Sequence, residues 1–265
     1  MTSGIEPAAN ARTLARAVEE AATGGASMLF TPEMSGMLDR DRTRAAGKIV
    51  PEAVSPVLAS VREAAAEAGL WVALGSLAIE REDGRWANRS FVIDSRGEVV
   101  ARYDKMHMFD VSLASGESWR ESAAYAAGEA VTTAEETPVG KLGLTVCYDI
   151  RFPALFEELG RRSCDVIAIP AAFTVPTGKA HWHVLQRARA IEASAFVVAA
   201  AQVGEHEDGR RTYGHSLVVD PWGEVLLDMG GERADLAFAE IDIARVSDVR
   251  AQLPSLANKR AIPRS

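Results

Sequence analysis

Cysteine is scarce in this 265-residue chain, which contains only Cys147 and Cys164, and neither belongs to a CxxC or zinc-like pattern. This count argues against a disulfide scaffold and favours a reducing compartment. The sequence also lacks a run of the roughly 18 apolar residues that a membrane-spanning helix needs, and no basic segment precedes an apolar one at its start. We therefore expect a cytoplasmic protein with no membrane partner.

Positive charge and histidine are in short supply as well. The chain has 29 Lys and Arg against 37 Asp and Glu, a formal net charge of −8. This excess of negative charge disfavours nucleic acid as a partner and leaves a small molecule as the expected ligand. Among the five histidines, His181 and His183 have the His-x-His spacing of some metal sites. On a helix these two side chains point in different directions, so we predict no metal site.

The patterns that are present favour one layered α/β domain over residues 1–265. The composition, 48% hydrophobic and 25% charged, is ordinary for such a domain, and helical and strand patterns alternate without a repeat or a linker. We expect helices at 10–22, 54–68 and 180–194. We expect strands at 27–30, 70–79, 90–93, 98–103, 165–169, 196–202, 216–220, 224–228 and 236–241. We expect a surface loop at 111–130 and an extended arm at 244–265.

Residues 143–153 (GLTVCYDIRFP) are the most informative stretch of the chain. An apolar run leads to Cys147 and breaks at once into polar residues, and Pro153 suits the first turn of a following helix. Cys147 is therefore predicted at a strand-to-helix elbow, where a side chain projects into a crevice and backbone N–H groups are free to bind an oxyanion. A buried structural cysteine is the alternative for Cys147, and it is our interpretation of Cys164. Apolar residues at helical spacing follow Pro153, namely Leu155, Phe156 and Leu159.

Two further reactive residues also follow predicted strands. Glu33 comes directly after residues 27–30, and Lys105 follows residues 98–103. Either residue taken alone is better interpreted as a solvated surface side chain. Together with Cys147 they make a coherent chemistry, because a cysteine must lose its proton to attack and a carboxylate can take that proton. A lysine can then stabilise the developing oxyanion.

Three segments carry a resemblance to the nitrilase superfamily of carbon–nitrogen hydrolases. They are residues 30–33 (FTPE), 103–107 (YDKMH) and 143–153, in the order and spacing of that family. The resemblance implies an αββα sandwich, with two sheets between layers of helices. It also implies a general base at Glu33, stabilisation of the tetrahedral intermediate by Lys105 and a nucleophile at Cys147, with no cofactor.

The family often carries a second glutamate that positions the lysine or the substrate. Residues 119–122 (WRES) are similar to that motif, which implies Glu121. Glu117 and Glu129 lie in the same predicted loop and remain alternatives.

Further segments resemble the branch that includes omega-amidases and deaminated-glutathione amidases. Residues 199–204 (AAAQVG) and the short loop after them look more like the deaminated-glutathione amidases. In this branch the free carboxylate of the substrate is held by residues that match Arg151 and Thr177, and an arginine fork suits that task. Phe173 and Tyr148 are the other substrate-binding candidates. The similar segments are residues 172–174, 177–178, 180–182, 187–192 and 213–223.

The resemblance thus implies a cysteine-dependent amidase that cleaves a small carboxylate-bearing amide, foremost deaminated glutathione, through a thioester. An omega-amidase acting on α-ketoglutaramate or succinamate and an N-carbamoyl amino acid hydrolase are the alternatives within the family. A catalytically silent scaffold or binding protein of the same fold is the alternative outside catalysis. The intact set of Glu33, Lys105 and Cys147 argues against that last possibility.

The resemblance carries two expectations about the ends of the chain and its assembly. Family members begin with a short apolar strand just before a segment like residues 2–4, and that first strand is expected to be missing here through a late start or trimming. Members commonly pair through helices, so we expect a homodimer or a higher homo-oligomer. The helix at 180–194 and the arm at 244–265 are the candidate contacts.

Overall fold

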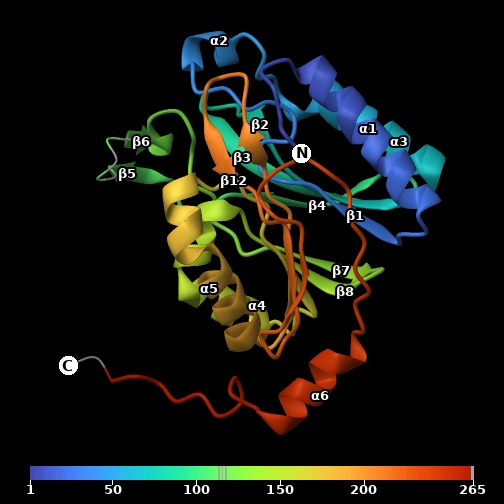
Figure 1. The fold of residues 1–265 in the computed structure, drawn as a ribbon, viewed down its shortest axis with the longest axis vertical. Coiled ribbons are helices and arrows are strands. Elements are labelled where there is room, and N and C mark those ends of the chain that lie inside the picture. Colours follow the sequence, from blue (N-terminus) through green and yellow to red (C-terminus); the bar gives the residue numbers. More distant parts are fainter. Residues whose placement is uncertain (113, 115, 117, 264–265) are drawn as a thin grey trace.

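Two β-sheets lie face to face in the computed structural model, which describes residues 1–112, 114, 116 and 118–263, and helices cover the outer face of each sheet (Figure 1). The first sheet has four strands in the order β1-β2-β3-β4. Strands β1 and β2 are parallel and the other pairs are antiparallel. Helices α1 and α3 pack on it. The bounds are α1 (Pro7–Thr23), β1 (Met28–Phe30), α3 (Pro56–Ala68), β2 (Trp71–Glu80), β3 (Trp86–Ile93) and β4 (Val99–Asp104).

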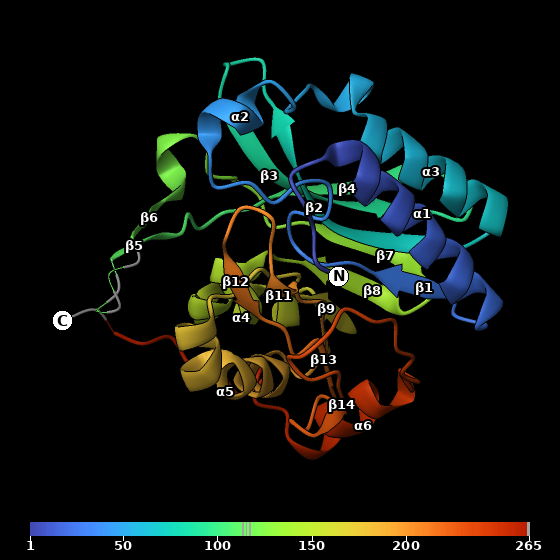
Figure 2. The same ribbon diagram turned by 45° about the horizontal axis from the view of Figure 1, so that its top comes forward.

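The second sheet has six strands in the order β14-β13-β10-β9-β8-β7. Its central strands β8, β9 and β10 run parallel, and the outer strands are antiparallel to their neighbours. Helices α4 and α5 cover this sheet on the side away from the first sheet (Figure 2). The bounds are β7 (Thr133–Thr137), β8 (Gly140–Leu144), α4 (Pro153–Arg161), β9 (Val166–Ala168), α5 (Val175–Ala193), β10 (Phe196–Ala199), β13 (Leu217–Val219) and β14 (Val225–Asp228).

The apolar core follows these layers. One cluster fills the space between α1, α3 and the outer face of the first sheet. A larger cluster runs from the inner face of the first sheet, through the second sheet, to α4 and α5. Val92 and Tyr103 contribute from the first sheet and Leu142 from the second, and all three are fully or almost fully buried. The predicted helix–sheet–sheet–helix arrangement is therefore confirmed, since burial on both faces of each sheet requires it.

Shorter elements complete the fold. A ribbon of β5 and β6 and a hairpin of β11 and β12 flank the ends of the sheets, and the loop before α2 is tied to the hairpin by the Arg40 N–H, which donates to Asp208 at 2.8 Å. The bounds are α2 (Arg42–Ala46), η1 (Glu52–Val54), β5 (Asp110–Ser112), β6 (Ser118–Arg120), η2 (Glu121–Ala123), η3 (Cys147–Arg151), β11 (Val203–Glu205), β12 (Arg211–Tyr213) and α6 (Ala244–Gln252).

The structure corrects four sequence-based element predictions. The predicted surface loop at 111–130 contains the end of β5, its partner strand β6 and the short helix η2. Helix α5 begins at Val175 instead of residue 180, because Pro176 suits its first turn. Residues 236–241 do not form a strand, since they have no ladder partner among the described residues, although they share a groove with β1. The predicted arm at 244–265 begins with α6, whose Val246 and Val249 are buried, and its last two residues lie outside the described part. No helix in the described ranges has the combination of length and apolar character needed to cross a bilayer.

Gly75 in β2 provides a test of how the first sheet positions the segment that follows β1. A Cβ atom at this position would lie 2.0 Å from the Thr31 carbonyl oxygen and 2.4 Å from that of Pro32. We expect Gly75→Ala to lower the free energy of unfolding by about 3 kcal/mol, because backbone must move to admit the methyl group. Urea denaturation measures this change.

Gly47→Ala is the matched control, since an added Cβ there meets nothing within 4 Å and the backbone has φ −72°. Its effect should stay within about 0.5 kcal/mol. Equal urea midpoints for the two variants would show that the close approach at Gly75 is not a constraint.

Candidate active site

Three loops that leave strand ends bring Glu33, Lys105 and Cys147 together. Glu33 follows β1 and Lys105 follows β4, both in the first sheet, whereas Cys147 follows β8 in the second sheet. All three side chains are buried, and all three line one pocket. The two sheets therefore contribute different members of the site that the sequence predicted.

Cys147 lies at the predicted elbow, between β8 and the short helical turn η3. Its backbone has φ 49°, in the left-handed region that non-glycine residues rarely adopt, and its N–H donates to the Pro170 carbonyl at 2.9 Å. Such a conformation is costly and persists only where the surroundings enforce it. Cys147 is 8% exposed, and its thiol is close enough to the Glu33 carboxylate for each group to shift the pKa of the other.

Glu33 is held by donors on both carboxylate oxygens. Oε1 accepts from Asn88 Nδ2 at 2.9 Å and from Lys105 Nζ at 3.1 Å, and Oε2 accepts from the Ala172 N–H at 2.9 Å. Burial alone would raise the pKa of Glu33. The Lys105 charge and the hydrogen bonds outweigh burial and hold this pKa below its ordinary value, so the carboxylate is ionised.

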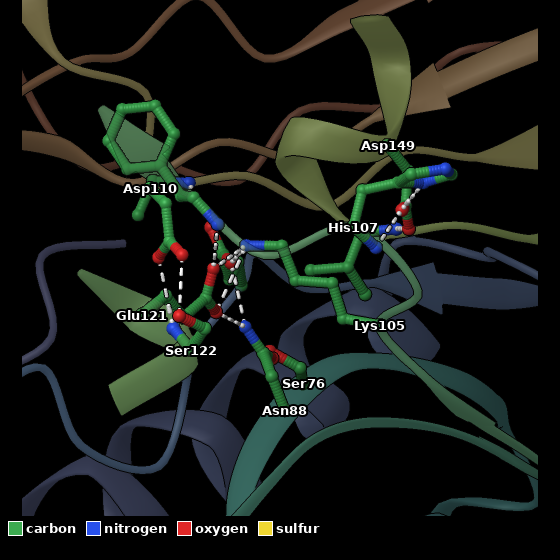
Figure 3. Close-up of polar contacts among 12 residues, drawn as sticks. Ser76, Asn88, Lys105, His107, Asp110, Glu121, Ser122 and Asp149 are labelled. Carbon is green, nitrogen blue, oxygen red and sulfur yellow. Dashed lines mark hydrogen bonds and ion pairs between the residues drawn. The ribbon is translucent and has the colours of Figure 1, made fainter. Parts of the chain in front are cut away.

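Lys105 is a fully buried ammonium between two carboxylates. Its Nζ lies 2.8 Å and 3.1 Å from the two oxygens of Glu121, in addition to its contact with Glu33. Figure 3 shows the Lys105 amine directed at Glu121, with the Asn88 amide beside them. Burial would lower the pKa of Lys105, but the charges of Glu121 and Glu33 raise it well above its ordinary value. The side chain is therefore a fixed positive charge.

The thiol of Cys147 keeps its proton in this resting arrangement. Burial raises its pKa first, the negative charge of Glu33 raises it further, and Lys105 only partly opposes them. The site thus holds a neutral thiol, an ionised Glu33 and a charged Lys105. This arrangement can pass a proton from sulfur to Glu33 as the sulfur attacks, and it can place a positive charge beside an oxyanion.

Glu121 is the glutamate that meets Lys105. Its Oε2 also accepts from the Phe109 N–H at 2.7 Å, which fixes the carboxylate at the start of η2. Glu129 is exposed and is not among the partners of Lys105. Glu117 lies outside the described residues.

Two buried polar residues support the site and were missed by reasoning from the sequence. Asn88 on β3 bridges Glu33 and Glu121, the latter at 3.2 Å. Asp149 accepts from the Tyr103 hydroxyl at 2.7 Å and from the N–H groups of His107 and Val146 at 3.0 Å and 2.9 Å, which ties the elbow to the loop after β4. Asp149 lies inside the 143–153 motif, where its polarity was a usable signal. Asn88 stands among strand residues with no such signal.

The predicted substrate-binding residues divide into two groups. Tyr148, Phe173 and Thr177 line the pocket that contains Cys147. Arg151 is not among the described residues that line it, but its guanidinium carbon lies 5.8 Å and 5.3 Å from the ring centres of Tyr148 and Phe173. The arginine therefore sits against two side chains that face the pocket.

A separate cluster has the composition of a metal site. The ligand atoms of His183, His215 and Asp228 lie within 4.8 Å of one another. The Asp228 carboxylate lies 3.0 Å from His183 Nε2 and 2.9 Å from His215 Nδ1. None of these three is among the described residues that line the Cys147 pocket. The sequence pattern could not reveal this group, because His215 and Asp228 lie on other elements than His183.

Comparisons with known proteins show which family this chain belongs to. The family model described as carbon-nitrogen hydrolase matches residues 3–251. The chain is 45% identical over 213 residues to a deaminated glutathione amidase of Yersinia enterocolitica, covering 78% of this chain and 73% of that protein. It is 37% identical over 266 residues to the deaminated glutathione amidase of Bos taurus, covering 98% and 80%. The crystal structure of Saccharomyces cerevisiae Nit3, a member of branch 10 of the nitrilase superfamily, is similar with a TM-score of 0.84 and 26% identity, over 96% of this chain and 92% of that one.

Asp149 should be essential to the stability of the site. We expect Asp149→Ala to lower the free energy of unfolding by about 3 kcal/mol, because buried donors of Tyr103 and Val146 lose their acceptor. Asp149→Asn should cost less, since the amide oxygen keeps one acceptor. Urea denaturation compares the two with Glu19→Ala, an exposed carboxylate on α1. Identical midpoints for Asp149→Ala and the control would contradict this role.

Proposed function

The chain belongs to the carbon–nitrogen hydrolase family of the nitrilase superfamily, and we propose that its substrate is deaminated glutathione. It is a hydrolase of carbon–nitrogen bonds other than peptide bonds. The observation that carries the proposal is the buried group of Cys147, Glu33 and Lys105, which line one pocket. The choice of substrate is supported by the names of the two relatives described above.

In the proposed first half of the reaction, Cys147 attacks the amide carbonyl. Its proton passes to Glu33, whose lowered pKa keeps the carboxylate ionised and able to accept it. The oxygen of the tetrahedral intermediate is stabilised by the Lys105 ammonium and by the backbone N–H of Tyr148. Glu121 keeps Lys105 charged and oriented throughout, because its two oxygens face Nζ.

In the second half, the intermediate collapses and the carbon–nitrogen bond breaks. Glu33 returns its proton to the departing amine of Cys-Gly, and a thioester remains on Cys147. Glu33 then takes a proton from water, which attacks the thioester and releases the acid while the sulfur regains a proton. The acyl part carries a carboxylate, for which Arg151 and Thr177 are the proposed partners.

Substitution of the proposed nucleophile or base should abolish or reduce hydrolysis while the protein stays folded. We expect Cys147→Ala to release no Cys-Gly from deaminated glutathione, and Glu33→Gln to lose at least about 100-fold in kcat. Release of Cys-Gly and the circular dichroism of each variant are measured together. Full activity of a folded Cys147→Ala protein would refute the mechanism. Turnover of α-ketoglutaramate or an N-carbamoyl amino acid instead would reassign the substrate.

Alkylation of Cys147 by iodoacetamide should report the pKa of the thiol. The raised pKa predicts that the alkylation rate still climbs above about pH 10, where an ordinary thiol has already levelled off. Glu33→Gln removes a negative charge that raises this pKa, so alkylation at a given pH should become faster although hydrolysis is lost. A plateau near the ordinary thiol pKa in the wild-type protein would count against the ground state described above.

We also propose that the protein is a cytoplasmic homodimer with one domain. Both cysteines are free and buried, which fits a reducing compartment. The exposed face of α5 carries Val184 and Ile191, which are 69% and 43% exposed. Trp222, 52% exposed, lies on the turn next to Ile191, where the Arg187 side chain donates to the Gly223 carbonyl at 2.7 Å. Exposed apolar side chains on a helix and on the turn beside it suit association with a second copy.

The proposed dimer predicts a sensitive position on α5. Val184→Asp should shift the protein toward the monomer mass in light scattering after size-exclusion chromatography, because it buries a charge in an apolar contact. Val54→Asp, at a valine that is 65% exposed on η1, is the control and should leave the mass unchanged. An unchanged mass for Val184→Asp would exclude this face as the interface.

A further inference from the structure

The pocket that contains Cys147 has an unexpectedly positive wall. Its lining includes five arginines, which we call the arginine rim: Arg40, Arg42, Arg120, Arg210 and Arg211. The protein as a whole has a net charge of −8, so this group of positive side chains gives the pocket wall a charge opposite to that of the protein. Within the described part of the chain, Arg210 is the one member of the rim with a carboxylate oxygen within 4.0 Å of its guanidinium. A pocket wall of this kind attracts an anion.

Arg210 is anchored at one end of its guanidinium. Its Nη2 lies 3.1 Å from Asp208 Oδ2, and the Asp208 side chain is fully buried. The same carboxylate accepts from the backbone N–H of Arg210 at 2.9 Å and of Arg40 at 2.8 Å. The Arg210 guanidinium carbon lies 4.7 Å from the centre of the Trp119 ring. The arginine is therefore oriented by its own loop and packs on an indole that comes from β6.

Two N–H donors in this stack have no acceptor among the described residues. Arg210 Nε and Trp119 Nε1 are both shielded from solvent, and neither donates to another described residue. A buried donor without an acceptor costs about 1–3 kcal/mol, and native structures contain few of them. Here two occur in contacting side chains from separate elements, and both side chains line the pocket. The missing acceptor is best supplied by a ligand.

We propose that Arg210 and Trp119 form a subsite for a carboxylate at the end of the substrate remote from the scissile bond. A carboxylate has two oxygens, so it can accept from the guanidinium and from the indole together. Because both nitrogens are covered in the stack, the carboxylate reaches them by parting the guanidinium from the ring. The other arginines of the rim supply positive potential without needing a direct contact.

This inference rests on the proposed function and makes it more specific. The leaving group of deaminated glutathione, Cys-Gly, ends in a carboxylate, whereas the leaving group of α-ketoglutaramate is ammonia. A subsite at Arg210 and Trp119 therefore gives the enzyme a contact that only the larger substrate uses. Arg151 and Thr177 remain the proposed partners of the carboxylate on the acyl side.

The test compares deaminated glutathione with its C-terminal carboxamide, in which the remote carboxylate is neutral. Wild-type protein should prefer the acid by about 10- to 100-fold in kcat/KM. Arg210→Met keeps an unbranched side chain as far as the position of Nε, and Trp119→Phe keeps an aromatic ring, but each removes a proposed donor. Each variant should lower the acid-to-carboxamide ratio about tenfold, mainly through KM. Arg233→Gln, at an arginine 83% exposed that is not among the pocket-lining residues, should leave the ratio unchanged.

Three results would overturn the subsite. The first is a wild-type acid-to-carboxamide ratio near one. The second is an acid-to-carboxamide ratio that is as high in both variants as in the wild-type protein. The third is an equal loss on α-ketoglutaramate, which would place the bound carboxylate on the acyl side.

A binding measurement separates this inference from the proposed function. Tryptophan fluorescence of the Cys147→Ala protein is titrated with N-acetylcysteinylglycine and with its carboxamide. Tighter binding of the acid that is lost in the Arg210→Met background supports the subsite even if the wild-type protein does not hydrolyse deaminated glutathione. Equal binding of acid and carboxamide refutes the subsite even if hydrolysis is observed.

Discussion

A buried ammonium ion is stable only when negative charge surrounds it, and Lys105 satisfies that condition with two carboxylates. Glu33 on one side and Glu121 on the other bring three charged groups into a space that is largely shielded from solvent. Desolvation of such groups costs several kcal/mol each, so each carboxylate is needed to keep the lysine charged, and the lysine is needed to keep them ionised. The protonation states of the site follow from this mutual dependence. Glu33 is ionised beside Lys105, and its charge in turn keeps the proton on Cys147.

The polar residues around these charged side chains hold them in position through hydrogen bonds. Asn88 donates to both carboxylates and so fixes the distance between them. Asp149 joins the elbow of the second sheet to the loop that follows Lys105 in the first sheet. The Ala172 N–H donates to Glu33 and comes from the loop after β9. Each of these contacts links segments that are remote in the sequence, which makes the position of one catalytic candidate depend on the folding of several loops.

The sequence was most informative where local pattern and chemistry coincide. Cys147 and Pro153 mark the elbow because strand, polar break and helix start follow one another within a few residues, and the structure has the helix from Pro153. Glu33 and Lys105 could be predicted as strand-end residues. Only the family resemblance predicts Glu121, because no rule of residue spacing indicates that it contacts Lys105.

Other features depend on partners that a sequence pattern does not name. The segment 236–241 has a strand-like composition but no neighbour to complete a ladder among the described residues. Residues 244–252 form a helix because it buries the side chains of Val246 and Val249. The stack of Arg210 on Trp119 joins residues from the β11–β12 hairpin and from β6, so neither residue signals it alone.

The division of the site between two sheets ties catalysis to the integrity of the whole core. Glu33 and Lys105 belong to the first sheet and Cys147 to the second, so their alignment is set by the apolar contacts that hold the sheets face to face. A partly opened molecule in which the sheets separate keeps every reactive side chain and has no active site. Selection for turnover therefore acts also on core side chains such as Val92 and Leu142, which are not among the described residues that line the pocket, because their packing sets how the two halves of the fold align.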